Sequence, residues 1–186
     1  GIDVPGPLEA VPWAHWERVV QLNLLATAIV VRAALPALRA SRGRVVTVAS
    51  TLGHRAVGDA TAYCASKFGV VGFTRALAAE YRGRVGVTLL TPGGMDTAFF
   101  DERDPQYQPA DRSTLADPAV VADAVAYLLG LPPEIPSAVM IPIGWPVGRH
   151  GVKATKDGMP LREELVTSMR PCLTNRLPKA FQHESS

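Results

Sequence analysis

Two apolar runs rich in β-branched residues are the strongest constraint on how this chain can fold. They cover residues 44–50 and 85–91, and neither alternates between polar and apolar positions. Continuous runs of this kind are typical of strands buried on both faces of a parallel sheet. A helical pattern spans residues 62–81 between them. Strands that alternate with helices predict an α/β domain built on a parallel sheet.

Polar side chains gather where the first predicted strand ends. Ser50 closes the run 44–50, at the edge where open α/β sheets bind their ligands. Tyr63 and Lys67 follow four residues apart, so they share one face of the predicted helix. A hydroxyl, a phenol and an amine near one strand end are suited to proton transfer.

These residues resemble the active-site motif of the short-chain dehydrogenase/reductases, a serine followed by Tyr-x-x-x-Lys thirteen residues later. Asn23, in Gln-Leu-Asn-Leu-Leu, resembles the asparagine that this family carries on the preceding helix. Residues 92–97, Pro-Gly-Gly-Met-Asp-Thr, resemble its Pro-Gly-x-x-x-Thr segment. A lone Tyr-x-x-x-Lys is a weak motif, but four segments in the right order are specific. The resemblance covers residues 1–146.

The resemblance implies a three-layer, doubly wound, Rossmann-like parallel sheet and reversible hydride transfer between NAD or NADP and a carbonyl or alcohol compound. Tyr63 is expected to be the general acid/base, and the Lys67 ammonium is expected to bring its phenol, ordinarily near pKa 10, toward neutral pH. Ser50 would hold the substrate oxygen, and Asn23, at a bulge in its helix, would support a proton relay. Cofactor contacts are expected from Tyr63, Lys67, Pro92, Gly93 and Thr97.

The resemblance also implies that the chain holds only the C-terminal strands and helices of the family's sheet. Gly1-Ile2 resembles the end of a family Asn-Asn-Ala-Gly motif, and no G-x-G-x-x-G cluster for a pyrophosphate occurs in the chain. The strand 44–50 would then lack a neighbour. We therefore expect the isolated chain to bind NAD(H) or NADP(H) weakly and to turn over poorly.

Other segments carry simpler signals. Residues 12–40 predict a long helix with a kink at Pro36. Asp59 or Thr61 is expected to cap the helix 62–81. The polar stretch 99–116 predicts a mobile loop with short helices that covers the substrate. Further predictions are a helix from Asp117 to 129, a short strand at 138–142, and a poorly ordered tail at 147–186 with helical character at 160–169.

The helix 62–81 is apolar nearly all round, which requires packing partners on two sides. The resemblance implies a homodimer or homotetramer formed through the helices at 12–40 and 62–81, with Gly69 and Gly72 permitting close approach. A catalytically inactive remnant, or an interaction module that uses the same helices, is the competing hypothesis. A Tyr63→Phe change should abolish activity only if the chain is an enzyme.

Charge, hydropathy and cysteine spacing argue against several classes of function. The net charge of +2 gives no reason to expect nucleic acid as a partner. No apolar run is judged long and uninterrupted enough to span a membrane, and no signal peptide is predicted. Cys64 and Cys172 lie far apart without metal-type spacing, so free thiols, a cytoplasmic location and no metal site are expected. His54 is expected at the substrate rim or in solvent rather than as a base.

Overall fold

The computed structural model of the chain describes residues 1–131 and 141–143. Three strands form one sheet in the order β1-β2-β3, namely β1 (Arg44–Val48), β2 (Gly86–Pro92) and β3 (Ile141–Ile143). Both pairings are parallel, which confirms the predicted α/β class. β1 pairs with β2 in a register that sets Val48 opposite Leu90, so the two strands end side by side.

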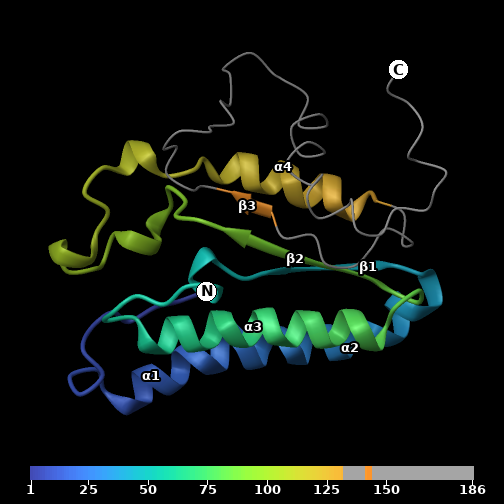
Figure 1. Ribbon diagram of the computed structural model, residues 1–186, viewed down its shortest axis with the longest axis horizontal. Helices are drawn as coiled ribbons and strands as arrows, with labels where there is room; N and C mark the ends of the chain where they lie inside the picture. Colours follow the sequence, from blue (N-terminus) through green and yellow to red (C-terminus); the bar gives the residue numbers. More distant parts are fainter. Residues whose placement is uncertain (132–140, 144–186) are drawn as a thin grey trace. The chain divides into compact units, whose positions relative to one another are not determined.

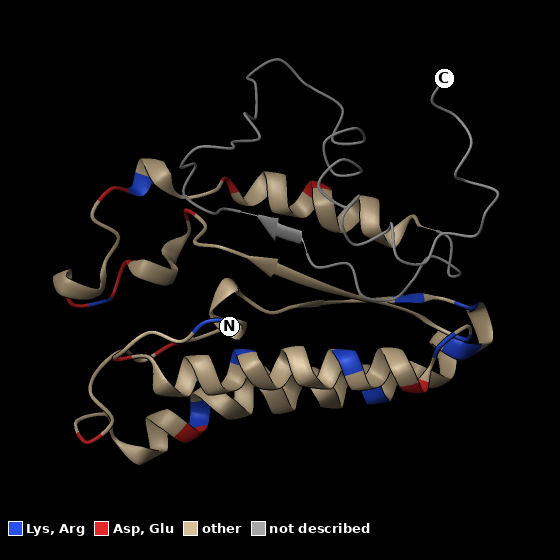
Figure 2. Cartoon of the chain, in the orientation of Figure 1, with Lys and Arg blue, Asp and Glu red and all other residues tan. Residues whose placement is uncertain are grey.

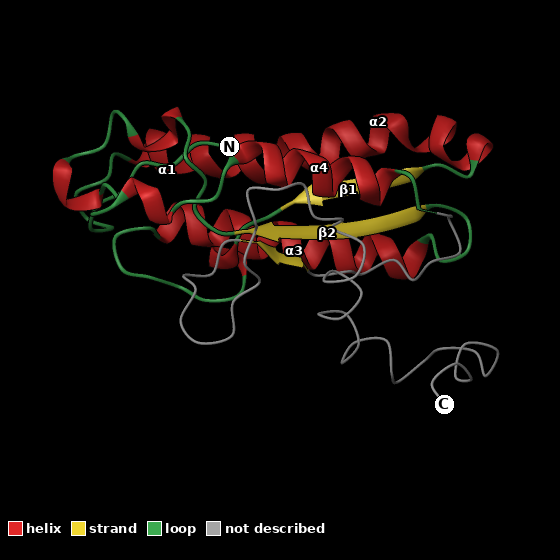
Figure 3. Ribbon diagram, turned by 90° about the horizontal axis from the view of Figure 1, so that it is seen from above, coloured by secondary structure: helices red, strands yellow, loops and turns green. Residues whose placement is uncertain are grey.

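Helices cover both faces of this sheet (Figures 1 and 3). A continuous helical stretch comprises α1 (Trp13–Val20), the π-helical η1 (Gln21–Leu25) and α2 (Ala26–Ser41). It lies on one side together with α3 (Thr61–Glu80), while α4 (Pro118–Leu129) lies on the other side. The predicted long helices are therefore present, and α2 runs through Pro36 without ending.

The core explains why the second strand has no polar alternation. Every residue of β2 is buried, because α3 packs on one face of the sheet and α4 on the other. One apolar cluster joins Val31 of α2, Leu77 of α3 and Val87 of β2. Inside the α3–β1 contact, the hydroxyls of Thr47 and Thr74 lie 2.7 Å apart, so these buried polar groups satisfy each other.

The predicted caps of the helices had different outcomes. Asp117 caps α4, since its carboxylate accepts from the backbone N–H of Ala119 at 2.8 Å. The caps predicted for α3 are wrong, because its N-cap is Ala60 and makes no side-chain hydrogen bond. Asp59 instead accepts from the Tyr107 hydroxyl at 3.1 Å, and Thr61 accepts from the Trp16 indole at 3.1 Å. Both oxygens tie the start of α3 to other segments.

Two predicted features lie wholly or partly outside the described residues. The third strand was expected at 138–142, and the structure shows it at Ile141–Ile143 while residues 138–140 are not described. The predicted tail at 147–186, with its helix at 160–169, is not described either.

The helical stretch Trp13–Ser41 is longer and more apolar than the sequence prediction about membrane spans allowed. Its 29 residues have a mean hydropathy of 1.7 in the most apolar window, which is long and apolar enough to cross a membrane by length and composition alone. Figure 2 shows few charged positions along α2 and α3. Only 17% of that window is buried, so an apolar face of this stretch remains uncovered by the described residues.

Candidate active site

The C-terminal ends of β1 and β2 and the first turns of α3 enclose a cavity of about 480 Å³. It lies at the strand edge where the sequence placed the functional side chains. Six of the seven predicted site residues line it, and these are Ser50, Tyr63, Lys67, Pro92, Gly93 and Thr97. Asn23 does not line the cavity and lies behind it.

Ser50 lies two residues beyond β1, with an extended backbone (φ −168°). It caps the short 3₁₀ turn Thr51–Gly53, and its hydroxyl accepts from the backbone N–H of Leu52 at 3.1 Å. Ser50 and Tyr63 line the same cavity, and hydrogen bonding by Ser50 acts to lower the pKa of the Tyr63 phenol. The turn therefore holds the Ser50 hydroxyl beside the phenol, where both can contact a single ligand oxygen.

Tyr63 is largely buried in the first turns of α3. Burial raises the pKa of its phenol, and the charge of Asp3 acts in the same direction. The hydrogen bond from Ser50 and the positive charge of Arg103 act against this rise. The pKa of the phenol is raised rather than brought toward neutral pH. This differs from the effect expected of Lys67, whose ammonium lies 5.6 Å from the centre of the Tyr63 ring.

Lys67 lies one turn further along α3 and is almost completely buried. Its ammonium donates to the backbone carbonyl of Val48 at 3.2 Å. Burial lowers its pKa from 10.5 to about 8. No ion pair of Lys67 is found in the described part of the chain, so its charge is poorly compensated there.

Asn23 lies in the π-helical turn η1 and is buried. Its amide donates to the carbonyl of Ile2 at 2.8 Å and to the Ser66 hydroxyl at 3.2 Å, while its oxygen accepts from the N–H of Ile2 at 2.9 Å. Gly1 comes close to both Asn23 and Lys67, since a Cβ on Gly1 would lie 2.7 Å from Asn23 Oδ1 and 3.6 Å from Lys67 Nζ. Asn23 thus joins the start of the chain to α3.

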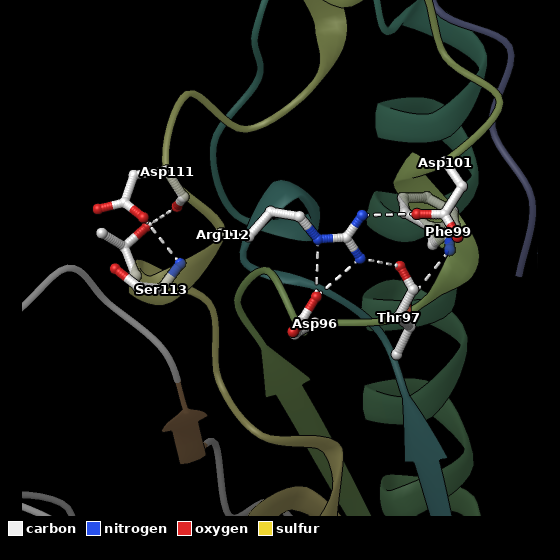
Figure 4. A network of polar contacts seen from close by, with 8 residues as sticks. Asp96, Thr97, Phe99, Asp101, Asp111, Arg112 and Ser113 are labelled. Atoms are coloured by element: carbon white, nitrogen blue, oxygen red, sulfur yellow. Dashed lines mark hydrogen bonds and ion pairs between the residues drawn. The ribbon is translucent and has the colours of Figure 1, made fainter.

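The segment that follows β2 is held by Arg112 (Figure 4). The Arg112 guanidinium donates to the carbonyl of Thr97 at 2.9 Å and pairs with Asp96 at 2.7 Å and with Asp101. Thr97 in turn caps the 3₁₀ turn Ala98–Phe100. Two more 3₁₀ turns follow, at Pro105–Tyr107 and Arg112–Thr114, which agrees with short helices predicted for this loop.

Sequence reasoning missed the ion pair at one wall of the cavity. Arg103 Nη2 lies 2.9 Å from Asp3 Oδ2, and both side chains are largely buried. The two residues are one hundred positions apart, and neither belongs to a motif. The sequence shows only a negative residue in one loop and a positive residue in another. Nothing in the sequence indicates that these two residues form a pair. His54 is exposed and does not line the cavity.

Metal chemistry gains no support from the side chains that are described. In residues 1–131 and 141–143, no three His, Cys, Asp or Glu side chains gather as a metal site requires.

Comparisons with known sequences give a consistent result. The sequence model of a family described as short chain dehydrogenase matches residues 1–108. An uncharacterized oxidoreductase of Staphylococcus aureus (strain MW2) is 35% identical over 123 residues, which are 65% of this chain and 51% of that protein. The 2,5-dichloro-2,5-cyclohexadiene-1,4-diol dehydrogenase LinX of Sphingobium indicum is 29% identical over 157 residues, 80% of this chain and 63% of that protein. The chain thus spans roughly half to two thirds of the length of these relatives.

Solved structures agree with the sequence relatives. A crystal structure of a putative NAD(P)-dependent gluconate 5-dehydrogenase of Beutenbergia cavernae, with bound NADP at low occupancy, matches with a TM-score of 0.68 and 32% identity. The match covers 76% of this chain and 61% of that one. Levodione reductase matches with a TM-score of 0.67 and 28% identity over 77% of this chain and 62% of its own.

Proposed function

The chain belongs to the short-chain dehydrogenase family, and from this premise we propose that it serves reversible hydride transfer between NAD or NADP and a carbonyl or alcohol compound. The relatives are named oxidoreductases and dehydrogenases. The observation that carries the proposal is the convergence of Ser50, Tyr63 and Lys67 on one cavity from β1 and α3. The Rossmann-like fold predicted from the motifs agrees with these relatives.

Tyr63 is the proposed general acid/base. Because burial raises the pKa of its phenol, the hydroxyl stays protonated at neutral pH and is ready to donate to a carbonyl oxygen. Ser50, which lines the same cavity, would donate a second hydrogen bond to that oxygen and hold it in place. In the reverse direction the same phenol oxygen would take up the proton of the alcohol.

The residues present fit the nicotinamide end of a dinucleotide. The Lys67 ammonium has three donors, and among the described residues the carbonyl of Val48 is the only hydrogen-bond acceptor seen for it, so further donors suit ribose hydroxyls. Pro92, Gly93 and Thr97 line the cavity at the end of β2, where the flat ring would lie. The bound cofactor would supply or accept the hydride. Asn23, bonded to residues beside Lys67, is proposed to support the proton relay.

We also propose a homodimer or homotetramer that uses the helices at 12–40 and 62–81. Leu22, Leu25 and Ile29 recur at helical spacing and are 43%, 50% and 67% exposed. Phe68 of α3 is 44% exposed. Such an exposed apolar face on neighbouring helices is suited to bind a second copy. Gly72 of α3 has open space around it, whereas Gly69 is already packed inside the chain.

A substitution at Tyr63 tests the enzymatic proposal directly. The unmodified chain is assayed with NADH and NADPH against a panel of ketones, and with NAD and NADP against alcohols, by the absorbance of the reduced nicotinamide. Tyr63→Phe should lower the rate by about 10²–10⁴-fold with an unchanged circular dichroism spectrum. Equal rates in both proteins would refute the role of Tyr63. A chain that dimerises but converts nothing would support the interaction-module hypothesis instead.

A further inference from the structure

A buried ion pair joins the start of the chain to the loop that follows β2. Arg103 and Asp3 both line the cavity, and their side chains are 13% and 5% exposed. Arg103 Nε is buried without a hydrogen-bond partner among the described residues. Because little water reaches this pair, its charges act on nearby groups with weak screening.

Arg103 also orders aromatic rings on its own loop. Its guanidinium carbon lies 4.3 Å from the centre of the Phe99 ring and 5.0 Å from that of Phe100. The Phe99 ring in turn packs on Tyr63, with 5.8 Å between ring centres and 51° between planes. A continuous set of contacts therefore runs from Asp3 through Arg103 and Phe99 to the Tyr63 ring.

A second contact anchors the same loop beside the start of α3. The Tyr107 hydroxyl donates to Asp59 Oδ2 at 3.1 Å. Within the loop, Gln108 Nε2 donates to the carbonyl of Arg103 at 2.7 Å. The loop is thus held at Asp3 and at Asp59, and its Phe99 packs on Tyr63.

We propose that the Asp3–Arg103 ion pair positions Tyr63 and controls the electrostatic environment of its phenol. The pair holds Phe99 against the phenol ring and places one negative and one positive charge beside the same cavity. Asp3 and Arg103 are positioning residues, because they act through Tyr63. The proposal goes beyond the proposed function and depends on it only for the catalytic use of the phenol.

The groups that face Tyr63 come from every element around it. Ser50, after β1, acts on the phenol by hydrogen bonding, and Lys67 and Cys64 lie beside it on α3. Asp3 and Arg103 come from the two loops. Apart from burial, the negative charge of Asp3 raises the pKa of Tyr63 and the positive charge of Arg103 lowers it. The two charges oppose each other, so removal of one reveals the effect of the other.

The test measures the ionisation of Tyr63 without any need for turnover. The chain contains four tyrosines, so ¹³Cζ-tyrosine NMR spectra are recorded against pH, and the signal absent from Tyr63→Phe is assigned to Tyr63. Asp3→Asn should shift its ionisation to lower pH, and Arg103→Gln should shift it to higher pH. Glu102→Gln, an exposed neighbour on the same loop, should leave it unchanged. Near-ultraviolet circular dichroism at each pH verifies that the protein remains folded.

Opposite shifts support the proposal, and equal or absent shifts in Asp3→Asn and Arg103→Gln overturn it. Arg103→Lys keeps the charge, so it should retain most of the parent ionisation, and behaviour like Arg103→Gln would refute a role for the charge. If Arg103→Gln does not fold, the nearly isosteric Asp3→Asn decides alone, and an unmoved signal overturns the proposal. A chain without turnover that shows the opposite shifts would refute only the proposed function.

Discussion

Gly69 of α3 faces Leu24 of the π-helical turn so closely that a Cβ on Gly69 would lie 2.5 Å from Leu24 Cδ2. The same turn buries Asn23, which bonds Ser66 of α3. The close approach of these helices is therefore linked to the position of the asparagine behind the cavity. Gly69 had been expected to permit close approach of a second subunit, and the structure shows that its small size is used within the chain.

This contact predicts different effects for two glycines on one helix. Gly69→Ala should destabilise the chain by about 1–3 kcal/mol, because Leu24 or the helix must move. Gly72→Ala is the matched control for packing within one chain, since no atom of the described residues lies within 4 Å of a Cβ there. It should be neutral or stabilising by up to about 1 kcal/mol. Urea denaturation measures both, and equal losses would show that Gly69 is not tightly packed.

Removal of the Asn23 amide should loosen the start of the chain. Asn23→Ala leaves the N–H and the carbonyl of Ile2 without their partner, and we expect a loss of about 1–3 kcal/mol in the free energy of unfolding. Hydrogen exchange at Ile2 should become faster. Gln21→Ala, an exposed position in the same turn, should change neither quantity, and a similar loss there would argue against a specific role of Asn23.

Because the pKa of Lys67 is lowered in the folded chain, we expect the free energy of unfolding to increase with pH. Its folded-state pKa of about 8 lies below the ordinary value of 10.5, so between these values the unfolded chain holds more protons. Stability should therefore rise with pH in this window, by up to about 3 kcal/mol in total. The raised pKa of Tyr63 acts oppositely at higher pH, so denaturation is compared from about pH 7.5 to about pH 9.5. Lys67→Met should remove the rise, and an unchanged slope would refute this assignment.

The exposed apolar residues Leu22, Leu25 and Ile29 lead us to expect that the chain forms a dimer or tetramer. Ile29→Glu places a charge on the proposed interface, and light scattering after size exclusion should show a smaller particle than for the unmodified chain. The helix itself should persist, because position 29 is 67% exposed. Arg32→Glu, also exposed on this helix, controls for a change of charge alone. An unmodified chain that elutes as a monomer would refute this interface.

We expect the contacts of Arg112 to keep the loop after β2 ordered. Arg112→Ala removes the contacts to Asp96, Thr97 and Asp101 (Figure 4), so limited proteolysis within residues 97–112 should become faster. Arg82→Ala, an exposed arginine in the turn after α3, should leave the cleavage rate unchanged. Equal cleavage of both variants would show that the loop is held by other contacts.

Local patterns predicted the elements well, because they depend on neighbouring residues. The burial of β2 on both faces explains its unbroken apolar run, and the four-residue spacing of Tyr63 and Lys67 places both on the face of α3 that borders the cavity. The caps of α3 could not be predicted, because Asp59 and Thr61 bind partners that are distant in sequence. The π-helical turn at Asn23 was expected only from the family resemblance.

The order of strands and helices, the family and the residues at the strand ends could all be predicted from the amino-acid sequence. These properties follow from periodicity and from spacing along the backbone. Which groups influence the Tyr63 phenol depends on the fold, because Asp3 and Arg103 are one hundred residues apart in the sequence and meet in space. The tertiary structure also showed that burial, rather than the Lys67 ammonium, is the largest influence on the pKa of the Tyr63 phenol. Electrostatic effects depend on distance and burial in space, and no local pattern encodes either.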